Sequence, residues 1–110
     1  MEELAAGTGA AAEPGREITI HYTVRLSNRS ELLDSTRGGH PFSFVLGRGE
    51  LVKGLDLGLV GMKVHGRRRV TVPPELAYGA RGMPPKIPGG ATLVYEIELV
   101  DVGDARGDAD

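Results

Sequence analysis

The chain has 110 residues, with 13 Lys and Arg, 15 Asp and Glu, and no Cys. This length is typical of one domain, and a formal net charge of −2 provides no strongly basic surface for nucleic acid or an anionic membrane. The absence of Cys excludes disulfides, thiolate nucleophiles and thiolate-bound metal centres.

The amino-terminal residues do not resemble a targeting segment. No apolar run approaches the roughly 20 residues of a membrane-spanning helix, and the acidic Met1-Glu2-Glu3 differs from the basic start of a secretory signal. We therefore expect a cytoplasmic monomer with neither nucleic-acid nor membrane partners.

The first half of the chain predicts short strands. A short edge strand is expected before Gly7, followed by a Gly- and Pro-containing loop to Gly15. Alternating apolar and polar residues from Glu17 to Leu26 then predict a half-buried antiparallel strand. Its inward face would carry Ile18, Ile20, Tyr22, Val24 and Leu26.

Further strands and one helix are expected in the middle of the chain. Turn residues 27–30 precede a short extended stretch at 32–34, which predicts a hairpin, and residues 41–47 alternate as another strand. Between Glu50 and Met62 the apolar spacing becomes helical, but Gly54 and Gly58 each weaken a helix by about 1 kcal/mol relative to Ala. A helix this short needs a sheet packed over it for stability.

The second half predicts two strands, at 67–72 and 92–101, joined by a long connection. Residues 73–90 contain 5 Pro and 4 Gly, and irregular connections of this length in compact domains are usually functional or disordered. The polar residues 103–110 are expected to form a mobile tail, which gives a folded domain of residues 1–102.

Two groups of polar residues are assigned to the solvated surface. His21, His40 and His65 lack the spacing of metal ligands. Successive residues of the Arg67-Arg68-Arg69 triplet point to opposite faces of a strand, so the triplet is interpreted as a solvated strand edge.

Several separate strings resemble the FKBP family of peptidyl-prolyl cis/trans isomerases in order and spacing. They are GREITIHYT, LLDST, PFSFVLG, LVKGLDLGLVGMKVHGRRRVTVPPELAYGARG and IPGGATLVYEIELVDV, and together they span about Glu3 to Val102. The resemblance implies an α+β fold in which an antiparallel sheet of five or six strands wraps around one short α-helix, with a pocket between helix and sheet. This agrees with the architecture expected from the patterns.

The resemblance also implies a site. The matching positions are Asp34, Val52 and Tyr78 for catalysis, and Tyr22, Leu33, Phe42, Leu51, Leu55, Ile87 and Tyr95 for substrate binding. In the family, the backbone N–H matching Val52 and the hydroxyl matching Tyr78 bind ligand carbonyls, while the acid matching Asp34 lies at the pocket rim. Core packing is the alternative role for Tyr22 and Phe44, and an ordinary turn is the alternative for Asp34.

The function implied is acceleration of Xaa-Pro bond rotation in peptides and unfolded proteins without a cofactor or metal. Tacrolimus and rapamycin are possible ligands of the same pocket. Leu55 and Leu33 stand where the family usually places Trp and Phe, Tyr95 replaces a usual Phe, and Lys86 adds a charge at the loop rim. These departures leave open a second function, a non-catalytic binding or chaperone module. With one residue fewer between Asp34 and Pro41, Arg37 is the nearest candidate partner of Asp34.

Overall fold

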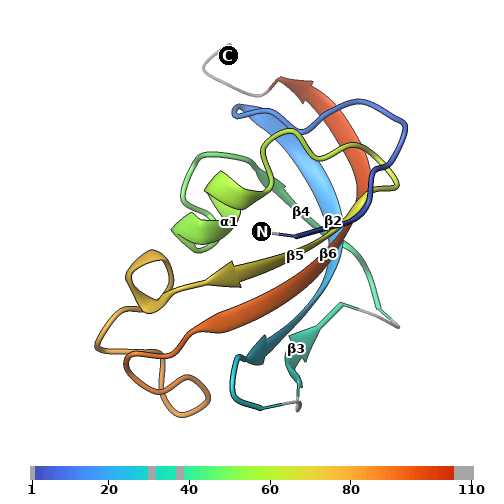
Figure 1. Ribbon diagram of the computed structural model, residues 1–110. Coiled ribbons are helices and arrows are strands. Elements are labelled where there is room, and N and C mark those ends of the chain that lie inside the picture. The colour runs from blue at the N-terminus through green and yellow to red at the C-terminus, as the bar shows by residue number, and fades with distance from the viewer. Residues whose placement is uncertain (1, 30–31, 37–38, 106–110) are drawn as a thin grey trace.

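The computed structural model describes residues 2–29, 32–36 and 39–105 of the chain (Figure 1). Its elements in chain order are β1 (Glu2–Ala5), β2 (Arg16–Leu26), β3 (Leu32–Ser35), β4 (Phe42–Val45), α1 (Lys53–Gly58), β5 (Arg67–Val72), the 3₁₀ turn η1 (Pro74–Leu76) and β6 (Leu93–Ala105). Every strand expected from the alternation is present, and so is the single short helix. The α+β fold class is therefore confirmed.

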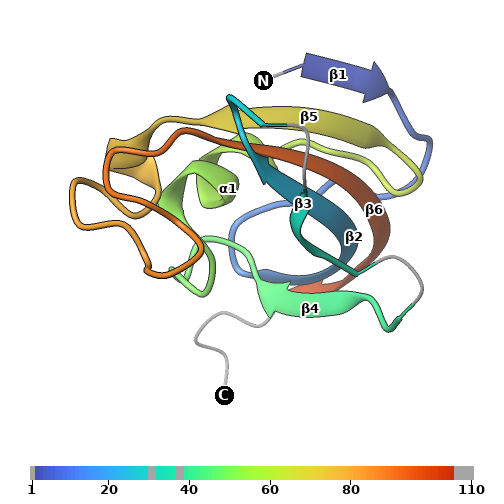
Figure 2. The same cartoon turned by 90° about the horizontal axis from the view of Figure 1, so that it is seen from below.

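The strands of the described chain form one antiparallel sheet in the order β1-β5-β6-β2-β3, with β4 pairing to β2 as well. β3 and β4 share one edge of β2, because β4 pairs with residues 17–20 and β3 with residues 23–25. The long strands β2 and β6 pair along most of their length and form the centre of the sheet. The sheet curves, and α1 lies in its hollow (Figure 2).

The core lies between the helix and the concave face of the sheet. Alternate residues of β2 and β6 point inward, so Ile18, Ile20, Leu93, Ile97 and Leu99 are almost completely buried. They pack with Leu55 and Leu59 from the helical segment. Val60, which belongs to the segment of helical apolar spacing, is 43% exposed, because α1 ends at Gly58 and the chain turns away.

Two glycines allow the helix to approach the sheet closely. A Cβ atom on Gly54 would lie 2.5 Å from Val72 Cγ1, and one on Gly58 would lie 2.9 Å from Val70 Cγ1. Both distances are too short for carbon atoms in contact. The glycines that weaken the helix in isolation are therefore the residues that let α1 pack on β5.

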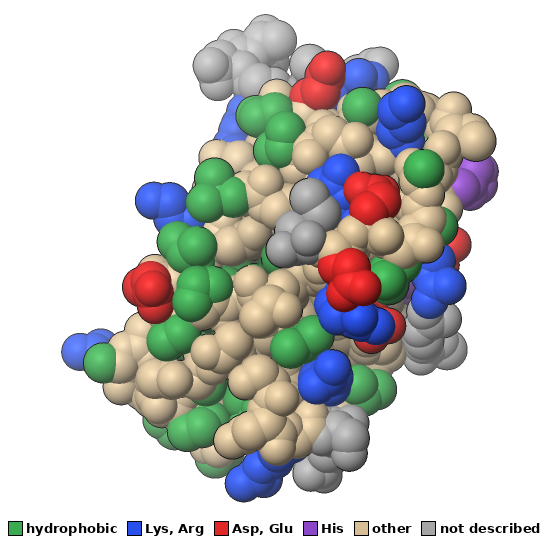
Figure 3. Space-filling view, viewed as in Figure 1, with side chains coloured by type: hydrophobic (Ala, Val, Ile, Leu, Met, Phe, Trp, Pro, Cys, Tyr) green, Lys and Arg blue, Asp and Glu red, His purple; other side chains and the backbone are tan. Residues whose placement is uncertain are grey.

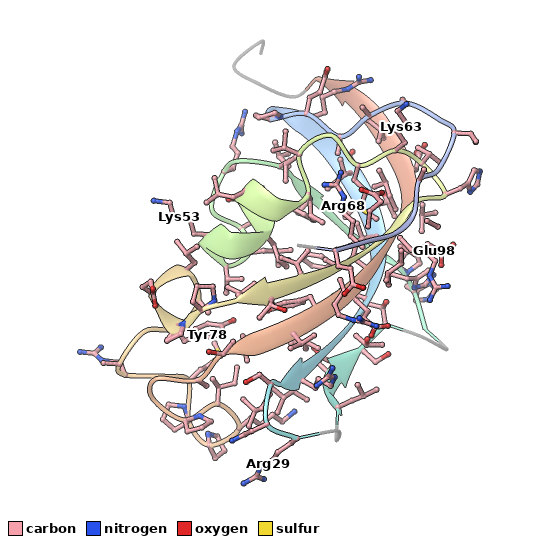
Figure 4. The ribbon with its side chains drawn as sticks, viewed as in Figure 1. Arg29, Lys53, Lys63, Arg68, Tyr78 and Glu98 are labelled. Carbon is pink, nitrogen blue, oxygen red and sulfur yellow. The ribbon has the colours of Figure 1, made fainter. Side chains whose placement is uncertain are left out.

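Arg68 corrects the interpretation of the arginine triplet as a solvated edge. Its side chain is buried, with the residue only 8% exposed, while Arg67 faces solvent. The Arg68 Nη1 atom donates to the carbonyl oxygens of Gly58 and Val60 at 2.8 and 3.0 Å, and Nε donates to Glu3 Oε1 at 3.0 Å. One guanidinium thus joins β1, β5 and the end of α1 (Figure 4).

The last strand extends beyond the expected end of the domain. β6 continues through Ala105, where it pairs with Arg16, and Arg16 Nε also donates to the Gly103 carbonyl oxygen at 2.8 Å. The strand therefore includes residues 103–105, which we had expected to begin the tail. Residues 106–110 and Arg37 lie outside the described residues.

Candidate functional site

A cavity of about 300 Å³ opens between the helix, the concave face of the sheet and the long connection that follows β5. We call it the main cavity. It is lined by Tyr22, Val24, Leu33, Asp34, Leu51, Leu55, Tyr78, Met83, Pro84, Pro85, Lys86, Ile87 and Tyr95. Most of this lining is apolar or aromatic, which is the usual character of a pocket that binds a small organic group.

The innermost wall of the main cavity comes from regular structure. Tyr22 and Val24 project from β2, Tyr95 from the adjacent part of β6, and Leu55 from the buried side of α1. Leu55 is 1% exposed, so it belongs to the core as well as to the cavity wall. The rings of Tyr22 and Tyr95 lie 6.2 Å apart between centroids, and the packed sheet holds both in place.

The outer wall comes from the connection of residues 73–90. Its backbone bonds to itself: the Met83 and Ile87 N–H groups each donate to the other's carbonyl oxygen, and the Gly82 N–H donates to the Tyr78 carbonyl oxygen at 3.0 Å. Tyr78 lies where this connection faces the start of α1 (Figure 4). Hydrogen bonds within the connection therefore hold the lip of the cavity in a defined shape.

A second, more polar depression continues from the main cavity and is called here the side groove. It is lined by Gly47, Gly49, Glu50, Leu51, Val52, Lys53, Asp56, Ala77, Tyr78 and Tyr95. The Asp56 carboxylate accepts from the Gly47 and Gly49 N–H groups, both at 2.9 Å, and so holds the loop before α1. Leu51, Tyr78 and Tyr95 belong to both depressions, so a bound chain can run from one into the other.

The donors available at these depressions include the Val52 N–H and the hydroxyls of Tyr78 and Tyr95, which have no partner among the described residues. Val52 precedes the first turn of α1, where backbone N–H groups have no partner within the helix. The site therefore offers donors to a ligand that carries carbonyl oxygens.

Asp34 is exposed at the rim and is held by neighbouring donors. The Tyr22 hydroxyl donates to Asp34 Oδ2 at 3.3 Å, and the Ser35 N–H donates to Oδ1 at 2.8 Å. Burial, followed by the negative charge of Asp34, raises the pKa of Tyr22 above its ordinary value. The Tyr22 hydroxyl therefore stays protonated at neutral pH.

Tyr95 is the most enclosed titratable group of the site. It is only 8% exposed, and burial raises the pKa of its hydroxyl well above the ordinary value, with smaller contributions from Tyr78, Tyr22 and Asp34. Its hydroxyl is therefore a neutral donor at any physiological pH.

The structure brings most of the residues expected in the site into one place. Of the ten, Phe42 does not line either depression. Its ring packs edge-on against Tyr22 at 6.4 Å and stacks on Phe44 at 5.7 Å between centroids, and the residue is 38% exposed, so it contacts the cavity wall only through Tyr22. Val52 lies in the side groove and not in the main cavity. Lys86 is at the rim, as expected.

Four residues that line the main cavity were not predicted as site residues from the sequence: Val24, Met83, Pro84 and Pro85. Val24 was assigned to the inward face of its strand, but its nearness to the cavity depends on how the sheet curves. The other three belong to the long Pro-rich connection, whose length was the available signal. Met83 is 52% exposed, so it extends the apolar lip toward solvent.

The described residues contain no group of three or more His, Cys, Asp and Glu side chains placed to hold a metal ion. None of their helices has the length and apolar character needed to span a bilayer.

Comparison with known proteins identifies relatives that match most of the chain. Residues 9–100 match the family model of FKBP-type peptidyl-prolyl cis-trans isomerases. An FK506-binding protein of Neisseria meningitidis is 44% identical, and the match covers 93% of this chain and 94% of that protein. The 39 kDa FK506-binding nuclear protein of Drosophila melanogaster is 50% identical over 93 residues, but the chain spans only about a quarter of its length.

A solved structure has the same fold. FkpA from Escherichia coli superimposes with a TM-score of 0.82 at 35% sequence identity, and the match covers 94% of this chain and 47% of that one.

Proposed function

The chain belongs to the FKBP-type peptidyl-prolyl cis-trans isomerase family, and we propose that it accelerates rotation about Xaa-Pro bonds by holding the prolyl imide in the main cavity. The observation that supports this proposal is an apolar cavity of about 300 Å³ whose unpartnered polar groups include hydrogen-bond donors. A prolyl segment suits these donors, because its ring is apolar, its nitrogen carries no hydrogen, and a carbonyl oxygen lies on either side.

The apolar wall supplies the driving force for rotation. The barrier of about 18–20 kcal/mol arises from amide resonance, which also gives the planar amide its charge separation. Transfer from water to an apolar wall therefore costs the charge-separated planar amide more free energy than it costs the twisted amide. The cavity thus binds the twisted amide preferentially, which is catalysis by differential binding.

Magnitudes indicate how the residues share the work. A rate gain of roughly 10³ to 10⁶ requires about 4–8 kcal/mol, whereas one hydrogen bond left unmade costs about 1–3 kcal/mol. We therefore assign most of the effect to the shape and dryness of the main cavity. Val52 N–H and the Tyr78 hydroxyl orient the substrate, and Asp34 fixes the Tyr22 ring through their hydrogen bond.

The proposed substrates are Xaa-Pro peptides and unfolded proteins. Binding is expected to be weak, because a folding helper must release many different segments. Uncatalysed isomerisation takes tens to hundreds of seconds at 25 °C, so a modest acceleration already affects a folding chain. Tacrolimus and rapamycin are proposed as ligands of the same cavity, in line with the names of the FK506-binding relatives. A cytoplasmic monomer stays a prediction.

The second candidate function is a binding module without catalysis. It is favoured by the aliphatic side chains of Leu33 and Leu55 in the cavity wall, because they make fewer ring contacts with a bound proline than aromatic residues would. Such a module would hold an unfolded segment without lowering its rotational barrier.

One exchange experiment separates the two functions. The rate of cis/trans exchange in an Ala-Leu-Pro-Phe peptide is measured by two-dimensional exchange NMR with and without catalytic amounts of the protein, and peptide binding is followed by chemical shifts of the protein. We expect faster exchange. Binding with an unchanged exchange rate would favour the module and reject the enzyme.

A further inference from the structure

Tyr95 is the most buried of the polar side chains that line the main cavity. The residue is 8% exposed, and it lines both the main cavity and the side groove. Its β6 neighbours Leu93 and Ile97 point to the same face and are fully apolar. The hydroxyl is therefore not needed for packing in the sheet.

The position of the Tyr95 hydroxyl can be inferred from its lack of a hydrogen-bond partner. The Tyr95 hydroxyl has no hydrogen-bond partner among the described residues. In that same part of the chain, no side-chain oxygen or nitrogen that is sealed from solvent lacks a partner. The Tyr95 oxygen must therefore be accessible, and because the ring itself is buried, the oxygen faces the depressions that the ring lines. Without a ligand in the cavity, water can serve as the hydrogen-bond partner of the Tyr95 hydroxyl.

Each carbonyl oxygen of a bound prolyl segment can be assigned to a hydrogen-bond donor of the site. Val52 N–H lines only the side groove, so it serves a carbonyl that has left the main cavity. The rotating imide must lie in the main cavity, where the wall is dry enough to lower its barrier. Among the described residues that line this cavity, the side-chain donors without a partner are the hydroxyls of Tyr78 and Tyr95 and the Lys86 ammonium. Lys86 is exposed to water, and Tyr95 is the more enclosed of the two tyrosines, so Tyr95 is the donor best placed for a buried carbonyl oxygen.

We propose that Tyr95 is a specificity-determining residue whose hydroxyl donates a hydrogen bond to the carbonyl oxygen that precedes the bound proline. The inference rests on the proposed function and adds a role for one atom. A site that provides such a donor discriminates against a ligand lacking the acceptor, because binding that ligand leaves the hydroxyl dry and unpaired.

The same hydrogen bond has a kinetic consequence with a definite sign. Resonance places more negative charge on the carbonyl oxygen of the planar amide than on that of the twisted amide. A donor to this oxygen therefore stabilises the bound ground state more than the transition state. Such an interaction tightens binding and slows the chemical step, so its removal raises KM and kcat together.

The test is a cycle that pairs one variant with one change in the substrate. Wild type and Tyr95→Phe are each titrated with the Ala-Leu-Pro-Phe peptide and with its analogue in which sulfur replaces the oxygen of the carbonyl before proline. Sulfur is a weaker acceptor. We expect Tyr95→Phe to bind the oxygen peptide roughly three- to ten-fold more weakly, and the sulfur substitution to cost the variant less affinity than it costs wild type. Exchange NMR at saturating peptide should show kcat raised roughly two- to five-fold.

Tyr22→Phe is the matched control. It also removes a hydroxyl from a ring in the cavity wall, but that hydroxyl is bonded to Asp34 at 3.3 Å. We expect no coupling between this variant and the sulfur substitution. Thermal unfolding at neutral pH verifies that both variants are folded.

Each outcome decides one question. If wild type binds and isomerises the peptide but Tyr95→Phe shows no coupling to the sulfur substitution, or loses kcat, the role given to Tyr95 is rejected and the proposed function stands. A second analogue, with sulfur at the carbonyl after proline, is titrated in the same way. Coupling of Tyr95→Phe to this analogue alone also rejects the role given to Tyr95. If wild type neither binds nor accelerates the peptide, the proposed function and this inference are rejected together.

Discussion

The proposed mechanism divides the work of single residues between orientation and desolvation, and a substitution at Tyr78 tests that division. Tyr78 lines both depressions, and its hydroxyl has no partner among the described residues. We expect Tyr78→Phe to weaken peptide binding by roughly three- to ten-fold while kcat stays within about ten-fold of wild type, because the apolar wall is retained. Saturation curves from exchange NMR measure both quantities. Loss of catalysis at unchanged affinity would show that the hydroxyl acts on the transition state.

Tyr95 also links the site to stability at alkaline pH. Burial raises the pKa of its hydroxyl above the ordinary value of 10.0. The unfolded chain releases this proton near pH 10, whereas the folded chain retains it to higher pH. The stabilisation is therefore complete below about pH 10 and is lost as the pH rises through the folded pKa.

The expected result is a steeper alkaline loss of stability in wild type than in Tyr95→Phe. The difference in slope should approach about 1.4 kcal/mol per pH unit for the one proton. Urea unfolding at neutral pH and between about pH 10 and 11.5 measures it. Parallel pH profiles for the two proteins would mean that Tyr95 titrates with equal ease in both states.

At the scale of elements, the contact between α1 and β5 requires glycine at a helical position, although glycine is a poor helix former. Gly54→Ala should strengthen an isolated helix by about 1 kcal/mol. Here we expect it to lower the free energy of unfolding by about 1–3 kcal/mol, because the new Cβ would lie 2.5 Å from Val72 Cγ1. Chemical denaturation measures the change.

The control for this prediction removes the obstructing atoms. In a Val72→Ala background, the added methyl group of Gly54→Ala meets no Cγ atom, so its cost should shrink or change sign. An equal cost in both backgrounds would show that the clash is not the cause.

A second junction between elements depends on one buried cation. Arg68 donates to two carbonyl oxygens at the end of α1 and pairs with Glu3 of β1. We expect Arg68→Met to lower the free energy of unfolding by about 1–3 kcal/mol, because the carbonyl oxygens of Gly58 and Val60 lose their donor. Arg67→Met on the exposed side of the same strand is the matched control, expected within about 0.5 kcal/mol of wild type in urea unfolding.

For the whole molecule, the question is how tightly the assembled cavity holds a large ligand. The wall comes mainly from α1, β2, β6 and the connection of residues 73–90. Apolar side chains lie along the edge of the molecule that carries α1 and this connection, on the left in Figure 3. Leu33 and Leu55 make this wall less aromatic than is usual in the family. We expect tacrolimus to bind with reduced affinity, weaker than nanomolar, by calorimetry. A nanomolar dissociation constant would show that the missing rings contribute little.

The amino-acid sequence by itself determined the strand pattern, the one short helix and the set of candidate residues. Alternation of period two is a local property, so β2 and β5 were predicted nearly to the residue. Most of the expected site residues do line the main cavity or the side groove, because the motif strings carry their order and spacing.

Only the tertiary structure decided the features that depend on contacts between distant segments. The burial of Arg68 requires β1 and the end of α1 to meet over one side of β5, and no local pattern records that meeting. The position of Phe42 outside the cavity lining, the continuation of β6 through Ala105 and the accessible Tyr95 oxygen at the cavity wall likewise depend on how the sheet curves. Curvature is a sum over all strand pairs, so it emerges only when the whole sheet is assembled.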